Sequence, residues 1–313
     1  MKIKIYSFDI FDTVLTRIVG NPTVLFLFLG KKLKDLSFIK CLPEEFLNYR
    51  INAEKEMRAI YGEVTLSDIY KRLGALLKWN EIECKKAMEI ECKLEESFIR
   101  PIPVVKERLE NLRKKAKRII FLSDMYLSSN FIKEQLEKYR LLTQKDKCYI
   151  SCEEKKSKID GGLFRYIVSS EGVFSKYISH CGNDPHSDIE VPKKIGFNIE
   201  PFLEGNLNRY EKILDSYALE TEGLSSIMAG ASRLTRLSIP VSTPEEKALR
   251  DVAAGVMAPV LTGFLLWILN RVQELSLKRL YFISRDGYIL LRIARKLVNK
   301  LNIECELRYL FGS

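Results

Sequence analysis

The chain has few of the residues that usually build metal clusters or disulfide frameworks. It holds two histidines in 313 residues, and its seven cysteines are odd in number and follow no regular spacing. Cys148, Cys152 and Cys181 could be grouped around zinc, but the separation of the first two is not that of a zinc knuckle. We therefore interpret the cysteines as reduced thiols, mostly buried on strands, of a cytoplasmic protein.

Concentrated charge is also lacking. Lys and Arg number 51 and Asp and Glu 41, a net charge of +10 that favours anionic partners. The basic residues are scattered along amphipathic segments, and no alternation of basic and aromatic residues indicates single-strand binding. We therefore expect no nucleic acid partner, and the charge leaves phosphorylated ligands and acidic membrane open.

Long apolar runs are scarce. Asp9 and Asp12 interrupt the first apolar stretch, so no signal peptide is predicted. Residues 252–269 carry no charge over about 18 residues, the lower limit for a membrane-spanning helix. Because they contain Gly255, Pro259 and Gly263, we interpret them as a buried helix packed against a partner domain and expect no stable membrane span.

Strand-like and helix-like segments alternate along residues 1–205. Short apolar runs predict strands at 3–9, 118–124, 148–151, 177–181 and 197–199. Apolar positions three and four apart predict helices at about 44–60, 66–78, 81–98, 104–117, 128–139, 161–170 and 188–195. This alternation predicts the α/β fold class, with a doubly wound, Rossmann-like parallel sheet. The helical stretch 18–100 lies between two strands, so we interpret it as an inserted cap in a core formed by 1–17 and 101–205.

Residues 206–313 have a different character. They begin with a basic helical region and continue as the start of a second α/β unit, with strands at 279–284 and 305–311 around a helix at 288–300. Two strands and one helix cannot bury a sheet alone, so we expect this part either to belong to a longer protein with further domains or to pack on the first domain. The turn 285–287 is equally typical of a phosphate-binding turn and of a plain tight turn.

Four polar segments follow the core strands in order. They are Asp9 with Thr13, then Ser123, then Lys158 near Lys155 and Lys156, and last the turn 182–188. Because the carboxyl ends of parallel strands share one edge of a sheet, all four would meet there. Together they offer an attacking carboxylate, a hydroxyl, an ammonium and an acidic turn for a divalent cation. Each alone has a plainer interpretation, as a strand end, a solvated lysine or a polar turn.

This ordered set resembles the haloacid dehalogenase (HAD) superfamily, whose members are mostly magnesium-dependent phosphohydrolases. The resemblance covers about 1–205, and its motifs are Phe8-Asp9-Ile10-Phe11-Asp12-Thr13, Leu122-Ser123-Asp124 and Lys158-Ile159-Asp160-Gly161. These stretches, and Ala258–Trp267 and Tyr281–Tyr288 in the tail, look similar to a bacterial subgroup of predicted hydrolases from capsule and surface-polysaccharide gene clusters.

The resemblance implies a role for each motif residue. Asp9 would be the nucleophile that becomes an aspartyl-phosphate, and Asp12 and Lys158 would assist catalysis. The phosphate would be bound by Thr13, Ser123, Asp124 and either Lys158 or its main alternative, Lys155. Mg²⁺ would be bound by Asp9, the main-chain carbonyl of Phe11, Asn183, Asp184 and Asp188.

Two positions depart from the family pattern. Where the phosphatases carry an acid that protonates the leaving oxygen, this chain has Phe11, and the nearest acid is Asp12. Asn183 stands where a carboxylate is usual, and a neutral amide is a weaker ligand for a hard cation.

We therefore predict a cytoplasmic Mg²⁺-dependent phosphohydrolase that acts on a small phosphorylated metabolite. The resemblance implies that this metabolite is a sugar phosphate of envelope polysaccharide synthesis. The alternatives are an impaired domain that binds a phosphorylated ligand or partner within a larger protein, and a metal-independent dehalogenase.

Overall fold

The chain forms two compact units in the computed structural model, which describes residues 3–312. The units are Met1–Pro240 and Val241–Ser313. The segment 206–240, which the sequence grouped with the C-terminal region, lies in the first unit.

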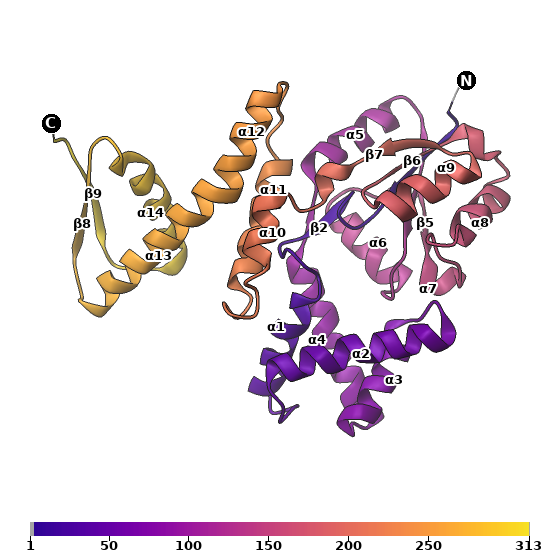
Figure 1. Cartoon of the computed structure of the whole chain (residues 1–313), viewed down its shortest axis with the longest axis horizontal. Helices are drawn as coiled ribbons and strands as arrows, with labels where there is room; N and C mark the ends of the chain where they lie inside the picture. Colours follow the sequence, from indigo (N-terminus) through magenta and orange to yellow (C-terminus); the bar gives the residue numbers. More distant parts are fainter. Residues whose placement is uncertain (1–2, 313) are drawn as a thin grey trace. The chain divides into compact units, whose positions relative to one another are not determined.

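A five-stranded parallel sheet forms the centre of the first unit (Figure 1). Its order is β5-β4-β1-β6-β7, with β1 (Ile5–Asp9) in the middle. The other strands are β4 (Arg118–Ser123), β5 (Lys147–Ile150), β6 (Ile178–Gly182) and β7 (Asn198–Pro201). The chain adds strands first on one side of β1 and then on the other, so the predicted doubly wound α/β fold is confirmed. The order in which strands are added reverses between β1 and β6, and doubly wound sheets bind ligands at this kind of reversal.

Helices cover both faces of this sheet. One face packs against α5 (Pro103–Lys114) and α6 (Ser129–Lys138), and the other against α8 (Gly162–Glu171) and α9 (Val191–Ile195). A short helix, α7 (Ser151–Glu154), follows β5, and a π-helical turn (Pro185–Glu190) precedes α9. Phe8 and Phe121 belong to one of the two resulting cores, and Ile5 and Leu122 to the other. Both faces of these strands are buried, which explains their continuous apolar sequence.

Four helices form the inserted cap, which is attached to the core by a small sheet. They are α1 (Val24–Asp35), α2 (Pro43–Tyr61), α3 (Leu66–Leu77) and α4 (Glu81–Phe98). Thr65 and Asn80 cap α3 and α4 with their side chains. The cap begins and ends at antiparallel strands β2 (Leu15–Arg17) and β3 (Ile99–Pro101), which the sequence analysis missed. At three residues each, they are too short to show a period.

Two further helices, α10 (Arg209–Asp215) and α11 (Leu224–Leu237), are bonded to the segment that follows β2. The Gly20 amide donates to the Ser226 carbonyl at 2.9 Å, and Arg233 donates to the carbonyl of Val19 at 3.0 Å. A Cβ on Gly230 would stand 2.2 Å from the Val19 nitrogen, so a glycine is required for this approach. The start of the cap is thereby tied to α11.

The second unit contains one βαβ motif and a long apolar helix. Parallel strands β8 (Arg279–Ile283) and β9 (Glu306–Leu310) flank α14 (Gly287–Leu301), close to the predicted bounds. Leu265, Phe282 and Leu291 form its small core, while Tyr281 and Ile283 are exposed.

The long apolar helix is more exposed than we predicted. Helix α12 (Pro244–Val252), a π-helical turn (Ala253–Met257) and α13 (Ala258–Glu274) are continuous. Within residues 3–312, this is the single helix long and apolar enough to cross a membrane, and 28% of its most apolar stretch is buried. Val260, Phe264 and Trp267 are exposed, and the expected packing of this helix against a partner domain stays a prediction. The absence of a membrane span stays a prediction.

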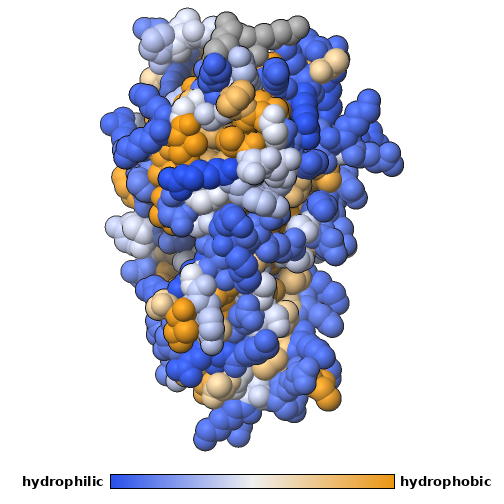
Figure 2. Space-filling model, turned by 90° about the vertical axis from the view of Figure 1, so that its right-hand side faces the viewer, coloured by the Kyte–Doolittle hydropathy of each residue, from blue (hydrophilic) through white to orange (hydrophobic). Residues whose placement is uncertain are grey.

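The scattered charge expected from the sequence agrees with the surface. The face in Figure 2 is largely hydrophilic, with hydrophobic residues gathered in small patches.

Candidate functional site

The carboxyl ends of the central strands surround a pocket of about 370 Å³. Asp9 ends β1, Ser123 ends β4, and Lys158 and Asp188 lie in the loops that follow β5 and β6; all four line the pocket. The predicted meeting of the four segments at one edge of the sheet therefore occurs in the structure.

A buried lysine joins two buried carboxylates at the floor of this pocket. The Lys158 Nζ donates to Asp9 Oδ1 at 2.5 Å and to Asp188 Oδ1 at 2.7 Å. Burial, with a contribution from the Asp188 charge, raises the pKa of Asp9 to about 7, while Lys158 opposes the shift. Burial would raise the pKa of the Asp188 carboxyl, but the contacts with Lys158 and His180 outweigh it and lower this pKa. The two carboxylates raise the pKa of Lys158, so it stays charged.

His180 and Ser7 support Asp188 from within the sheet. His180 Nε2 lies 3.2 Å from Asp188 Oδ1, and His180 Nδ1 lies 2.6 Å from Ser7 Oγ. Ser7 and His180 are register partners on β1 and β6, and both are buried. The sequence analysis missed this pair. A histidine and a serine within otherwise apolar strands were the one signal that pointed to it.

Asp124 and Lys155 do not take the phosphate-binding roles predicted for them. The Asp124 carboxylate accepts hydrogen bonds from the Lys158 amide and the Ser157 hydroxyl, both at 2.9 Å, and so positions the Lys158 loop. Lys155 is exposed, lies outside the pocket and donates to the Glu63 carbonyl at 3.1 Å. Lys158 is therefore the lysine of this site. Lys155 itself has a left-handed backbone conformation, with φ of 51°, and its side chain lies outside the pocket.

The turn after β6 contributes fewer free oxygens than predicted. Thr13 Oγ1 donates to Asn183 Oδ1 at 3.2 Å, which places Thr13 behind the pocket. Asp184 accepts from the amides of His186 and Ser187, so its carboxylate caps its own turn. His186 is exposed in that turn and does not line the pocket.

Asp12 and Phe11 are held by two arginines. Asp12 Oδ1 accepts from the Thr16 hydroxyl at 2.8 Å and lies 3.1 Å from an Arg233 Nη1. The Phe11 ring packs under the Arg17 guanidinium, with 3.9 Å between the ring centroid and Cζ. Arg17 is itself paired with Glu95 of the cap.

The side chains at the site fit a hard divalent cation in chemistry. Those available are the carboxylates of Asp9 and Asp188 and the amide of Asn183, all oxygen donors of the kind that Mg²⁺ prefers. Within residues 3–312, no three His, Cys, Asp or Glu side chains are grouped as a metal cluster would require. A cation here would therefore have two carboxylates, with neutral oxygens completing its coordination.

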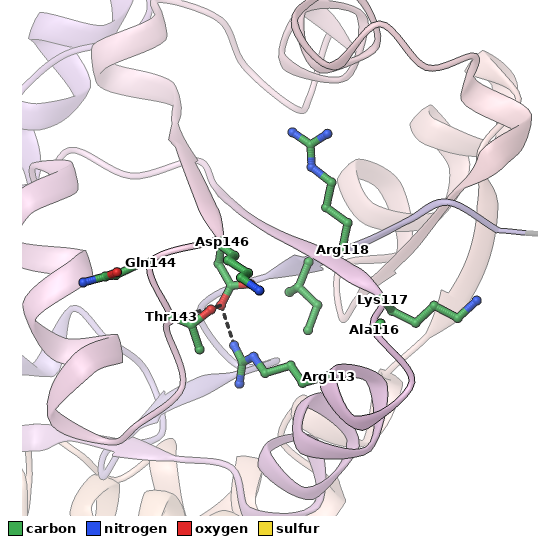
Figure 3. Close-up of a pocket in the computed structure, with 9 residues that line it drawn as sticks. Arg113, Ala116, Lys117, Arg118, Thr143, Gln144 and Asp146 are labelled. Carbon is green, nitrogen blue, oxygen red and sulfur yellow. Dashed lines mark hydrogen bonds and ion pairs between the residues drawn. The ribbon is translucent and has the colours of Figure 1, made fainter.

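A larger pocket of about 870 Å³ lies at the opposite, amino-terminal ends of β4 and β5 (Figure 3). It is lined by basic residues, and Arg113 is paired with Asp146 at 2.6 Å. Because the buried Lys158 and the carboxylates of Asp9 and Asp188 line the smaller pocket, we take that pocket as the candidate site.

No family model matches the sequence, and neither does any curated protein. Among solved structures, the chain is similar to the 2-haloacid dehalogenase from Pseudomonas syringae pv. Tomato DC3000, with a TM-score of 0.51 and 15% identity over 64% of this chain and 87% of that one. It is also similar to a HAD family enzyme from Bacteroides thetaiotaomicron in complex with magnesium and inorganic phosphate (TM-score 0.43, 15% identity, 64% and 93% covered). A third similar structure is a HAD phosphatase from Thermococcus onnurineus (TM-score 0.44, 18% identity, 64% and 85% covered). The likeness to the dehalogenase, at its low identity, shows that the chain has the α/β fold of haloacid dehalogenase-type enzymes.

Proposed function

We propose that this chain is a phosphohydrolase that transfers a phosphoryl group from a small phosphorylated metabolite to Asp9 and then to water. The observation that carries the proposal is the buried Lys158 ammonium between the carboxylates of Asp9 and Asp188, at the floor of a pocket. An anionic nucleophile can approach an anionic phosphoryl group only where a fixed cation screens the two.

The remaining groups suit the same reaction. The Asp9 carboxylate is the nucleophile, and Lys158 neutralises charge on the transferred group. Ser123 lines the pocket beside Asp9, where its hydroxyl can bind a phosphoryl oxygen. Asp9, Asp188 and Asn183 would hold Mg²⁺, which when bound supplies further positive charge to the phosphoryl oxygens.

The substrate class comes from the sequence resemblance. Phosphorylated sugars of envelope polysaccharide synthesis in the bacterial cytoplasm are the first compounds to test. The pocket, of about 370 Å³ and partly lined by Phe26 of the cap, suits a small metabolite.

The direct test is to trap the aspartyl-phosphate. Wild-type protein mixed with Mg²⁺ and a panel of phosphate compounds should release inorganic phosphate, and mass spectrometry should find a phosphoryl group on Asp9. Asp9→Asn should abolish both signals. Asp35→Asn, the same change at an exposed residue outside the pocket, should leave them intact. No phosphate release and no labelling with any compound would refute the proposal.

A second candidate is a domain that binds a phosphorylated ligand without turnover. Phe11 and the engagement of Asp12 by Arg233 favour it, because both remove acid–base help. Calorimetry with inorganic phosphate separates the two: binding that is independent of Mg²⁺ and unchanged in Asp9→Ala supports this candidate. Halide release from a 2-haloacid without added metal would instead identify a dehalogenase.

A further inference from the structure

The pocket holds no side chain that is both acidic and free to protonate a leaving group. Its titratable lining residues are Asp9, Asp12, Arg17, Asp124, Tyr126, Lys158, Asp184 and Asp188. Each is either the nucleophile, engaged by a partner, or a poor proton donor.

Asp12, the nearest acid, is fixed from the far side by Arg233. The Arg233 side chain is 2% exposed, and its Nη1 lies 3.1 Å from Asp12 Oδ1. Its Nη2 donates to the carbonyls of Arg17 and Val19 at 3.1 and 3.0 Å, so the guanidinium is itself fixed. Asp12 also accepts the Thr16 hydroxyl and sits in the left-handed region, with φ of 58°. If the Asp12 side chain turned towards a substrate, the buried Arg233 guanidinium would lose its carboxylate partner, which costs free energy.

The other acids serve the loops that carry them. Asp124 accepts the Lys158 amide, Asp184 caps its own turn, and Asp188 accepts Lys158 and the Asp184 amide. Their carboxylates act as acceptors throughout, so none is presented as a donor.

The three remaining titratable groups keep their protons. Arg17 is paired with Glu95, and the Lys158 ammonium is bonded to Asp9 and Asp188. Burial raises the pKa of the Tyr126 phenol. A group that holds its proton this tightly gives little help to a departing oxygen.

Four apolar side chains line the pocket that contains Asp9. Phe11 is fixed under Arg17, and Phe26, Met125 and Ile159 line the same pocket. Such side chains suit an acyl or aryl group.

From these observations, and resting on the phosphohydrolase proposed above while departing from its first test compounds, we infer that the substrates are phosphoryl compounds whose leaving group departs as a stable anion, above all acyl phosphates, and not phosphate esters of sugar hydroxyl groups. An acyl phosphate needs no proton donor, because a carboxylate is already a stable leaving group.

The reaction balances without an acid. An Asp9 oxygen forms a bond to phosphorus, the bond from phosphorus to the acyl oxygen breaks, and its electron pair leaves with the carboxylate. Water then attacks the phosphorus of the aspartyl-phosphate, the bond to the Asp9 oxygen breaks, and both water protons stay on the product as dihydrogen phosphate.

The experiment compares leaving groups on the wild-type protein with Mg²⁺. The probes are acetyl phosphate, a series of substituted phenyl phosphates, and glucose 6-phosphate. We expect kcat/KM to fall steeply as the leaving-group pKa rises, with acetyl phosphate at least about 100-fold above glucose 6-phosphate, the scale of a missing general acid. Similar values for both would overturn this inference and leave the phosphohydrolase in place. No turnover of any probe would overturn the phosphohydrolase itself.

Matched variants test the cause. Phe11→Asp places a carboxyl on the lining of the pocket, while Arg17 stays paired with Glu95, and should raise kcat/KM for glucose 6-phosphate by at least about 10-fold while changing acetyl phosphate little. Phe11→Asn, of similar size without an acid, should not. Asp12→Asn should leave the dependence on leaving-group pKa unchanged. A selective loss of sugar-phosphate turnover in Asp12→Asn would show that Asp12 donates the proton, and would overturn the inference.

Discussion

The shared lysine at the floor of the pocket predicts that the nucleophile destabilises the metal-free protein. Asp9 and Asp188 contact one ammonium, so one negative charge is left over in a buried site. Burial raises the pKa of Asp9 from its ordinary 3.8 to about 7. Because this folded-state value lies above that of the unfolded chain, the folded protein favours protonated Asp9. The resulting loss of stability is absent below about pH 4 and complete above about pH 7.

The magnitude is set by the two pKa values. One pKa unit corresponds to about 1.4 kcal/mol, so the ionised Asp9 lowers the free energy of unfolding by about 4 kcal/mol at pH 8. The asparagine side chain of Asp9→Asn has the same shape as the protonated, uncharged aspartic acid and cannot ionise. It should therefore stabilise the metal-free protein by up to about 4 kcal/mol at pH 8 and by almost nothing at pH 4.

Thermal unfolding in a chelator, at pH 4 and pH 8, measures this difference. At roughly 2–4 °C per kcal/mol for a unit of this size, the Asp9→Asn protein should unfold about 8–16 °C higher at pH 8. Mg²⁺ should reduce the gap by stabilising the wild type alone. Asp35→Asn, the same change at an exposed residue outside the pocket, is the control and should shift the midpoint little at either pH. An Asp9→Asn protein no more stable than wild type at pH 8 would refute the reasoning.

Four further predictions concern the supports of the site. Lys158→Met leaves two buried carboxylates without their cation, so the free energy of unfolding in a chelator at pH 8 should fall by about 3–5 kcal/mol, and an unchanged value would contradict the pairing. His180→Leu removes a partner of Asp188 and should weaken Mg²⁺ binding by calorimetry about 10–100-fold, whereas equal affinity would show that His180 has only a packing role. Gly205→Ala would place a Cβ 1.8 Å from the Asp12 carbonyl oxygen, so it should displace the loop after Asp9. This displacement should lower kcat on acetyl phosphate at least about 10-fold, whereas a wild-type rate would show that the loop tolerates the shift. The pre-steady-state release of acetate should show a burst of about one equivalent, because Asp12 is held by Arg233 and Thr16 and is not free to activate the water that cleaves the aspartyl-phosphate, and a strictly linear release would argue against that.

The sheet and the core of the site could be predicted because they depend on local patterns. Strands buried on both faces appear as short apolar runs, and polar residues such as Asp9 and Ser123 stand out where those runs end. The parallel arrangement then brings the strand ends together without any knowledge of the loops.

The features that the sequence did not reveal depend on long-range contacts or on loop conformation. Arg233 lies more than two hundred residues from Asp12, and nothing in its own helical segment marks it as part of the site. Lys155 and Lys158 were near-equal candidates, because only the conformation of the loop decides which ammonium reaches the pocket. Strands β2 and β3 are stabilised mainly by pairing with each other across the cap, a contact no local window contains.

The position of Arg233 has a consequence for dividing this protein into parts. A chain cut after residue 205, where the sheet is complete, would keep all four strand-end motifs and still lose the guanidinium that orders the turn behind the nucleophile. A piece that keeps this turn bonded as in the whole protein therefore extends through α11, so α10 and α11 support the pocket and do not serve as a linker.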